Sequence, residues 1–315
     1  MSKPRAQSGV ALITVLVILF IAVALSVSMQ WQTSLDQRRT ATLVQGDQAL
    51  EYALGAEAWA EQILRRDYQQ NPNATTLGQD WAQQLPPLPV EGGQILGHLE
   101  DLQGRFNLNS LAGGQNAASL QQFQRLLTAL NLDPLLANAV SDWVNNGLNP
   151  NPLGGAKDDT YTRLQPPYLT ADQPMTSISE LLLVKGVTPQ VYAQLLPYVC
   201  ALPVRAAPGT AAGPTTTPVN INTAAGPVLM SLDPHITADL AADIIGRRGD
   251  NGFTSMQQVT QALNGVALPA TAGINSSYFL LTVRAEIGTT QITMYSLLYR
   301  NAGKTTAVRR TLGTL

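Results

Sequence analysis

The hydrophobic pattern separates one uncharged stretch near the N-terminus from a long mixed sequence. Residues 10–29 contain no charged side chain, and about 20 consecutive apolar residues are enough to cross a bilayer as a helix. Lys3 and Arg5 precede this stretch, and Arg38 and Arg39 are the first basic residues after it. Basic residues favour the cytoplasmic side of a membrane. We therefore predict a single span, with the N-terminus cytoplasmic and the larger part on the opposite side.

After the span the pattern stays helical before it becomes irregular. Leucines recur at helical spacing through residues 30–68, so the span and this segment predict one long helix. Glu57 and Glu61 interrupt its apolar face. Residues 71–93 are rich in Pro, Asn and Gly and predict a loop. Alternation in residues 93–103 predicts a strand that ends near Gly104.

The rest of the chain predicts a helical block followed by strands. Helical patterns cover 120–130, 135–144, 178–184, 189–196 and 223–264, and a linker rich in Pro, Gly and Thr, 203–218, divides them into two subdomains. Three strands follow at 278–287, 291–300 and 305–312, with Gly288 and Gly303 in the turns. This order predicts an α+β fold: a long N-terminal helix on a small antiparallel sheet, with a large α-helical domain inserted in the sheet.

Composition narrows the function classes. Apolar residues make up 45% of the 315, and the net charge of -2 gives no electrostatic reason to expect nucleic acid as a partner. The single cysteine, Cys200, lies in an apolar run and predicts a small buried hydrophobe. His98 and His235 lack a neighbouring Cys or His, which disfavours zinc. The string 301–305 resembles the end of a phosphate loop but lacks its leading Gly. We therefore expect no enzyme.

The junction Ser8-Gly9-Val10, between a basic leader and an apolar helix, resembles the leaders of type IV pilins. In that class a dedicated prepilin peptidase cuts after the Gly. Here the cut would follow Gly9, and Val10 would become the first mature residue. Most such proteins have Glu at mature position five, whereas this chain has Thr14. The string GVALITVLVI without that Glu resembles the minor pseudopilin K family of bacterial type II secretion systems, as do DLQGRFNLNSL, SISELLLVKGV, LLPYVCALP and VNINTAAGPVL.

The resemblance implies an organisation and a role. It implies a leader (1–9), a transmembrane helix (10–29), a pilin-like helix with the first strand (30–103), the inserted domain (104–275) and the C-terminal strands (276–315). It further implies methylation, anchoring in the bacterial inner membrane and a periplasmic head. The implied partners are minor pseudopilins of the I, J and H types and the major pseudopilin. The subunit would form the tip of the pseudopilus, initiate its assembly and support export of folded proteins across the outer membrane.

Thr14 is the candidate determinant of the tip position. In ordinary pilin-like subunits, the resemblance implies, the Glu carboxylate at mature position five meets the N-terminal amine of an earlier subunit. The first subunit has no earlier amine to meet, and a buried unpaired charge costs several kcal/mol. The hydroxyl of Thr14 can instead bond to a carbonyl of its own helix. The alternative is that Thr14 is simply a tolerated small polar residue.

A polar loop between residues 133 and 180 supplies the candidate metal ligands. Calcium takes carboxylate, amide and carbonyl oxygens, and the resemblance implies calcium in the inserted domain. We expect Asp142, Asp158 and Asp159 to contribute ligands. However, the string Gly-Ala-Lys-Asp places Lys157 where the family usually has an acid. A plainly solvated loop therefore stays open as the alternative.

Two segments, 177–195 and 219–255, resemble helix-hairpin-helix or SAM-like units. In DNA competence and repair proteins such units offer backbone amides to a DNA phosphate. The alternative function is therefore a membrane-tethered DNA-uptake protein. Both hairpins here contain Pro, which lacks an N–H donor, and the second contains Asp233, which would repel phosphate. The residues favour a helix-packing module without nucleic acid.

Overall fold

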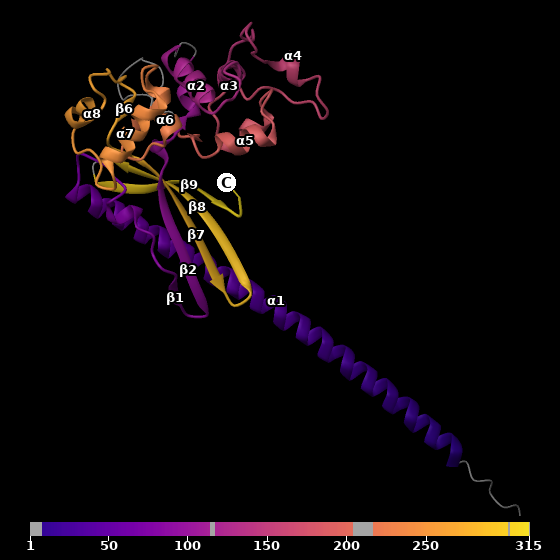
Figure 1. Cartoon of the computed structure of the whole chain (residues 1–315). Coiled ribbons are helices and arrows are strands. Elements are labelled where there is room, and N and C mark those ends of the chain that lie inside the picture. The colour runs from indigo at the N-terminus through magenta and orange to yellow at the C-terminus, as the bar shows by residue number, and fades with distance from the viewer. Residues whose placement is uncertain (1–7, 114–116, 204–216, 302, 315) are drawn as a thin grey trace, which may run out of the picture.

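The computed structural model describes residues 8–113, 117–203, 217–301 and 303–314. Helix α1 (Ser8–Gln70) is 63 residues long. Its N-terminal part projects alone, while its C-terminal part lies along one face of the sheet (Figure 1). The predicted long helix is confirmed.

The sheet has five antiparallel strands in the order β1-β2-β7-β8-β9. They are β1 (Leu88–Val90), β2 (Gly93–Asp101), β7 (Tyr278–Ile287), β8 (Thr290–Asn301) and β9 (Lys304–Leu312). The strands predicted after residue 276 are confirmed. Strand β2 pairs directly with β7, from Gly93 opposite Ile287 to Asp101 opposite Phe279. The chain between them therefore leaves and rejoins the sheet at one end, and the predicted fold class is confirmed.

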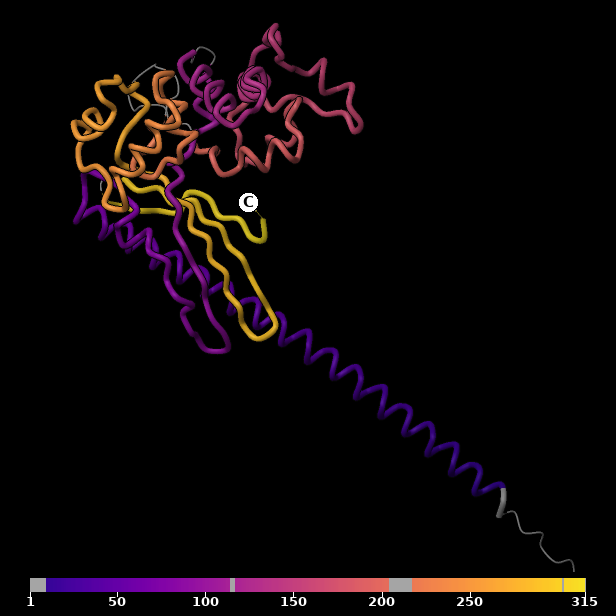
Figure 2. Tube along the Cα trace, in the orientation of Figure 1, coloured from indigo at the N-terminus to yellow at the C-terminus, as the bar shows by residue number. Residues whose placement is uncertain are grey.

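The inserted domain lies at the end of the sheet farther from the free part of α1 (Figures 1 and 2). Its helices are α2 (Ala117–Ala129), α3 (Leu136–Val144), α4 (Asp158–Tyr161), α5 (Pro189–Leu195), α6 (Gly226–Leu232), α7 (Ala238–Arg248) and α8 (Met256–Ala262), with 3-10 turns η2 (Leu102–Gly104), η3 (Leu108–Leu111) and η4 (Ile178–Leu183). Two short parallel pairs, β3 (Phe106–Asn107) with β4 (Val199–Cys200) and β5 (Val219–Asn220) with β6 (Ala272–Gly273), complete it. One hydrophobic core unites both halves. Most of the predicted linker, 204–216, lies outside the described residues.

One local prediction was wrong. The segment 71–93 is not all loop, because it contains the 3-10 turn η1 (Asp80–Ala82) as well as β1. Trp81 is buried and packs edge-on against Phe279, with 5.2 Å between ring centroids. Strand β1 tolerates Pro89 because it lies at the sheet edge. The helical pattern over 178–184 is confirmed as the 3-10 helix η4.

The core of the head lies between α1 and the sheet. Along α1, Ala49, Ala53, Ala60 and Leu64 are at most 4% exposed and recur every four to seven residues. Ala49 packs with Ala285 and Ile287 of β7. The other three pack with buried side chains of the central strands: Phe279, Leu281, Val283, Met294 and Leu298. The small alanine side chains let the helix backbone approach the sheet closely. Burial of each large apolar side chain contributes about 1.5–3 kcal/mol to the free energy of unfolding.

Candidate functional site

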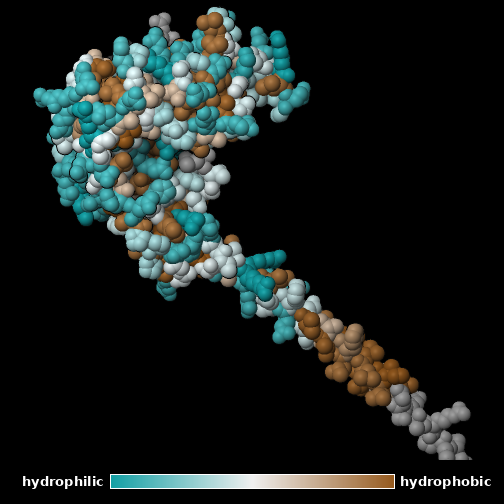
Figure 3. All heavy atoms as spheres, in the orientation of Figure 1, coloured by the Kyte–Doolittle hydropathy of each residue, from teal (hydrophilic) through white to brown (hydrophobic). Residues whose placement is uncertain are grey.

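The free part of α1 is the most apolar surface of the molecule. One stretch of this helix is long and apolar enough to cross a membrane, and none of its most apolar window is buried. Figure 3 shows this end of the helix as a continuous brown surface, separated from the head by more polar residues. The described residues thus support a single membrane anchor near the N-terminus.

Thr14 makes the backbone contact expected of it. Its Oγ1 donates to the carbonyl oxygen of Ala11 at 2.9 Å, within α1. The hydroxyl is thereby satisfied without a partner subunit. Helix α1 begins at Ser8, so the proposed cut between Gly9 and Val10 falls in its first turn. Cleavage there and a tip role for Thr14 stay predictions.

Two acids on α1 attach the helix to the C-terminal strands. Glu57 is 4% exposed, accepts from Ser296 Oγ at 2.6 Å, and accepts from Arg310 Nη2 and Nε at 2.6 and 2.7 Å. Glu61 accepts from the backbone N–H of Ala307 at 3.0 Å. Burial alone would raise the pKa of Glu57, but the hydrogen bonds and charge of Arg310 hold that pKa below its ordinary value. The two acids that interrupt the apolar pattern are therefore attachments to β8 and β9.

Replacing Glu57 with Gln should lower the free energy of unfolding by about 1–2 kcal/mol near neutral pH, because the half-exposed Arg310 loses its charged acceptor. A carboxyl with a lowered folded-state pKa stabilises above its ordinary value of 4.5, and this contribution is lost as pH falls through the lowered pKa. The difference between wild type and Glu57→Gln should thus shrink below that pH. Chemical denaturation of the full chain in detergent across pH measures it. A constant difference would contradict the assignment.

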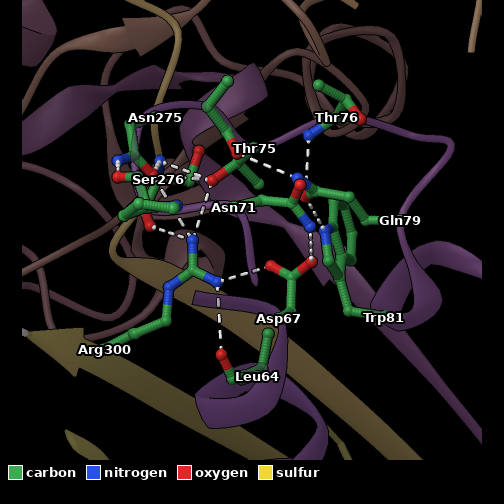
Figure 4. A network of polar contacts seen from close by, with 12 residues as sticks. Leu64, Asp67, Asn71, Thr75, Thr76, Gln79, Trp81, Asn275, Ser276 and Arg300 are labelled. Carbon is green, nitrogen blue, oxygen red and sulfur yellow. Dashed lines mark hydrogen bonds and ion pairs between the residues drawn. The ribbon is translucent and has the colours of Figure 1, made fainter. Parts of the chain in front are cut away.

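A third acid on α1, Asp67, meets a buried arginine at the junction with the inserted domain (Figure 4). Arg300 Nη1, on β8, lies 2.9 Å from Asp67 Oδ2, and both side chains are at most 2% exposed. Arg300 Nη2 donates to Thr75 Oγ1 at 2.8 Å and to the Ser276 carbonyl at 3.0 Å. Burial raises the pKa of Asp67 despite the opposing charge of Arg300. One guanidinium therefore joins the helix, the sheet and the segment that returns from the insertion.

Asp101 forms a neighbouring buried network where the inserted domain begins. Its Oδ2 accepts from Asn220 Nδ2 at 2.9 Å, Thr223 Oγ1 at 2.6 Å and Ser276 Oγ at 2.7 Å. Burial raises the pKa of Asp101, while these hydrogen bonds oppose the increase. Because Asp101 ends β2 and Ser276 precedes β7, this network fixes both connections of the inserted domain to the sheet.

Asp142, the first predicted calcium ligand, is engaged with the backbone of the following loop. Its Oδ2 accepts from the backbone N–H groups of Asn151 at 2.8 Å and Ala156 at 3.0 Å. A Cβ on Gly155 would lie 2.1 Å from that oxygen, so glycine is needed for the approach. The carboxylate thus holds the 151–156 segment of the loop against α3.

The other two predicted ligands do not converge with Asp142 on one centre. Asp158 and Asp159 open the short helix α4 and are exposed. Asp158 Oδ1 accepts from the backbone N–H of Thr170 at 2.8 Å and from its hydroxyl. Within the described part of the chain, no three His, Cys, Asp or Glu residues gather as a metal-binding group. Calcium binding stays a prediction, and this donor set does not fit a calcium centre.

Two adjacent arginines, Arg247 and Arg248, lie at the end of α7 in the second segment that resembles a DNA-binding unit. Arg248 is 8% exposed and donates to the carbonyl oxygens of Ile221 and Ala224. Arg247 pairs with Asp243 at 2.9 Å on the same helix. Arg248 therefore packs α7 against the neighbouring segment, while Arg247 makes a half-exposed ion pair within α7. Cys200 is buried as predicted, and burial raises its pKa to about 12, which makes it inert.

Comparison with known proteins agrees with this architecture. Two family models described as type II secretion system, protein K, match residues 104–204 and 219–280. The chain resembles a solved structure described as the GspK-GspI-GspJ complex from the enterotoxigenic Escherichia coli type 2 secretion system. The TM-score is 0.75 at 26% identity, with 88% of this chain and 100% of that chain covered.

Curated relatives match over nearly the whole length. The type II secretion system protein K of Aeromonas hydrophila is 35% identical, covering 95% of both chains. The protein of the same name from Klebsiella pneumoniae is 34% identical, covering 98% of this chain and 97% of its own. Together with the long helix, the sheet and the inserted helical domain, these matches show that the chain belongs to the type II secretion system protein K family.

Proposed function

We propose that this chain is the minor pseudopilin at the tip of the periplasmic pseudopilus, where it initiates assembly and supports export of folded proteins. The observation that carries the proposal is the position of the inserted domain. It covers the end of the head opposite the membrane helix (Figure 1). A bulky domain there leaves no place for another subunit to stack above, whereas subunits can be added below.

The proposed partners are other minor pseudopilins, first those of the I and J types. Support comes from the similar solved chain, which is part of a GspK-GspI-GspJ complex. The H-type pseudopilin and the major pseudopilin would follow below. The apolar helix would be held in the inner membrane after cleavage behind Gly9 by the prepilin peptidase. Lys3 and Arg5 favour a cytoplasmic leader and a periplasmic head. The role is structural rather than catalytic.

Immunogold labelling of overproduced pseudopili tests the tip position. An epitope tag on this chain should give about one gold particle per fibre, at one end only, because a subunit that blocks stacking cannot occur inside the fibre. The matched control is the same tag on the major pseudopilin, which should label the entire shaft. Label from the tagged chain distributed along the shaft would rule out the tip role.

A further inference from the structure

A lysine is buried inside the loop that was expected to bind calcium. The side chain of Lys157 is 6% exposed, and its Nζ lies 2.5 Å from Asp172 Oδ1. The same ammonium group donates to the carbonyl oxygen of Asn145. Lysine is almost never buried unless it is paired. Both contacts therefore supply the oxygen acceptors that burial of this charge requires.

These two contacts fasten distant parts of the loop to each other. Asn145 caps the C-terminus of α3, where free carbonyl groups carry partial negative charge. Asp172 has a positive φ of 51°, unusual for a residue with a Cβ, and its backbone N–H donates to the Trp143 carbonyl at 3.1 Å. Lys157 thus holds the returning segment against the end of α3.

Two nearby carboxylates also interact with the charge of this ammonium group. Burial raises the pKa of Asp142, and the positive charge of Lys157 opposes that increase. The hydrogen bonds from Thr170 lower the pKa of Asp158, and the charge of Lys157 adds to them. One carboxylate, that of Asp172, and one carbonyl therefore bond to the ammonium group, while the charges of Asp142 and Asp158 interact with it from farther away. These are the oxygen types that calcium takes in proteins.

We propose that the Lys157 ammonium group is the cation that orders this loop, in place of a bound calcium ion. A divalent ion needs several oxygens directed at one point. Here those oxygens bond instead to the ammonium group, to backbone N–H groups and to Thr170. The inserted domain then folds with its loop closed whether calcium is present or absent.

Thermal unfolding of the full chain in detergent, with calcium chloride or with EGTA, tests this. The wild-type melting temperature should be the same in both solutions. Lys157→Met should melt about 2–5 °C lower in both, because the Asn145 carbonyl and the exposed carboxylate of Asp172 lose their shared partner. Lys157→Glu should also melt lower in EGTA but recover when calcium is added, since a ligand bound to the folded state stabilises it.

Lys185→Met is the matched control, because Lys185 is exposed. Its Nζ makes one long contact with the same loop, 3.4 Å from the Gly155 carbonyl oxygen. This variant should melt like wild type. A wild-type melting temperature that rises with calcium would overturn the proposal, whatever the variants do. So would Lys157→Met melting no lower than Lys185→Met, or a folded Lys157→Glu that does not respond to calcium.

Discussion

Replacing Arg300 with Met is expected to lower the free energy of unfolding by about 3–5 kcal/mol, the usual cost of removing one partner of a buried ion pair. Asp67 would keep a buried charge without its cation. Thr75 Oγ1 and the Ser276 carbonyl would lose their donor. Contacts of the guanidinium with the Phe279 and Tyr68 rings, at 4.8 and 5.4 Å, would also be lost. Chemical denaturation of the full chain in detergent measures the change.

The control for Arg300→Met lies on the adjacent strand. Arg284 is about half-exposed and pairs with Glu286 at 2.9 Å, so Arg284→Met should change stability by no more than about 0.5 kcal/mol. The double variant Asp67→Asn with Arg300→Met should lose less stability than the two single variants lose together, because no unpaired charge remains. Equal losses in Arg300→Met and Arg284→Met would show that the junction does not depend on this ion pair.

The second large effect concerns processing. Gly9→Leu should abolish conversion of the precursor to the mature form, because the peptidase must fit closely around the cut and glycine alone lacks a Cβ. Mass spectrometry of protein from cells should find wild type beginning at Val10 and the variant retaining its leader. Pseudopilus assembly should fail in the variant.

Gly46→Leu provides the comparison for Gly9→Leu, since it makes the same substitution elsewhere on α1, where a Cβ meets nothing within 4 Å. It should be processed normally. Mature Gly9→Leu protein beginning at residue 10, or wild-type protein beginning well beyond Val10, would contradict pilin-type processing.

The elements with a clear period could be predicted from sequence. The strand over 278–287 has the observed bounds of β7, and the long apolar and helical run became α1. Strand β1 was missed because three residues flanked and interrupted by Pro show no alternation that can be recognised locally. It exists because β2 supplies its partner. The turn at Trp81 likewise depends on contact with Phe279, which lies far along the chain.

The polar contacts of the candidate site could not be predicted, because their partners are distant in sequence. Glu57 and Arg310 are 253 residues apart, and Asp67 and Arg300 are 233 apart. In the sequence, Glu57 interrupts an apolar face of the helix without a visible partner. Its partner, Arg310, is brought to it only when the sheet packs against α1. Thr14 was different, since its acceptor is three residues away in the same helix. Local chemistry was sufficient there.

The pairing of β2 with β7 also determines the order in which the molecule can fold. Residues 102–277 separate two strands that are neighbours in the sheet, and closure of so long a loop makes this pairing slow. The inserted domain has its own core and can condense first. Until β8 and β9 have been synthesised and have paired, Glu57 and Asp67 lack their arginine partners. The apolar face of α1 then also lacks the sheet against which it packs. A prematurely terminated chain therefore cannot complete its head, so the last residues synthesised decide whether a subunit is competent for assembly.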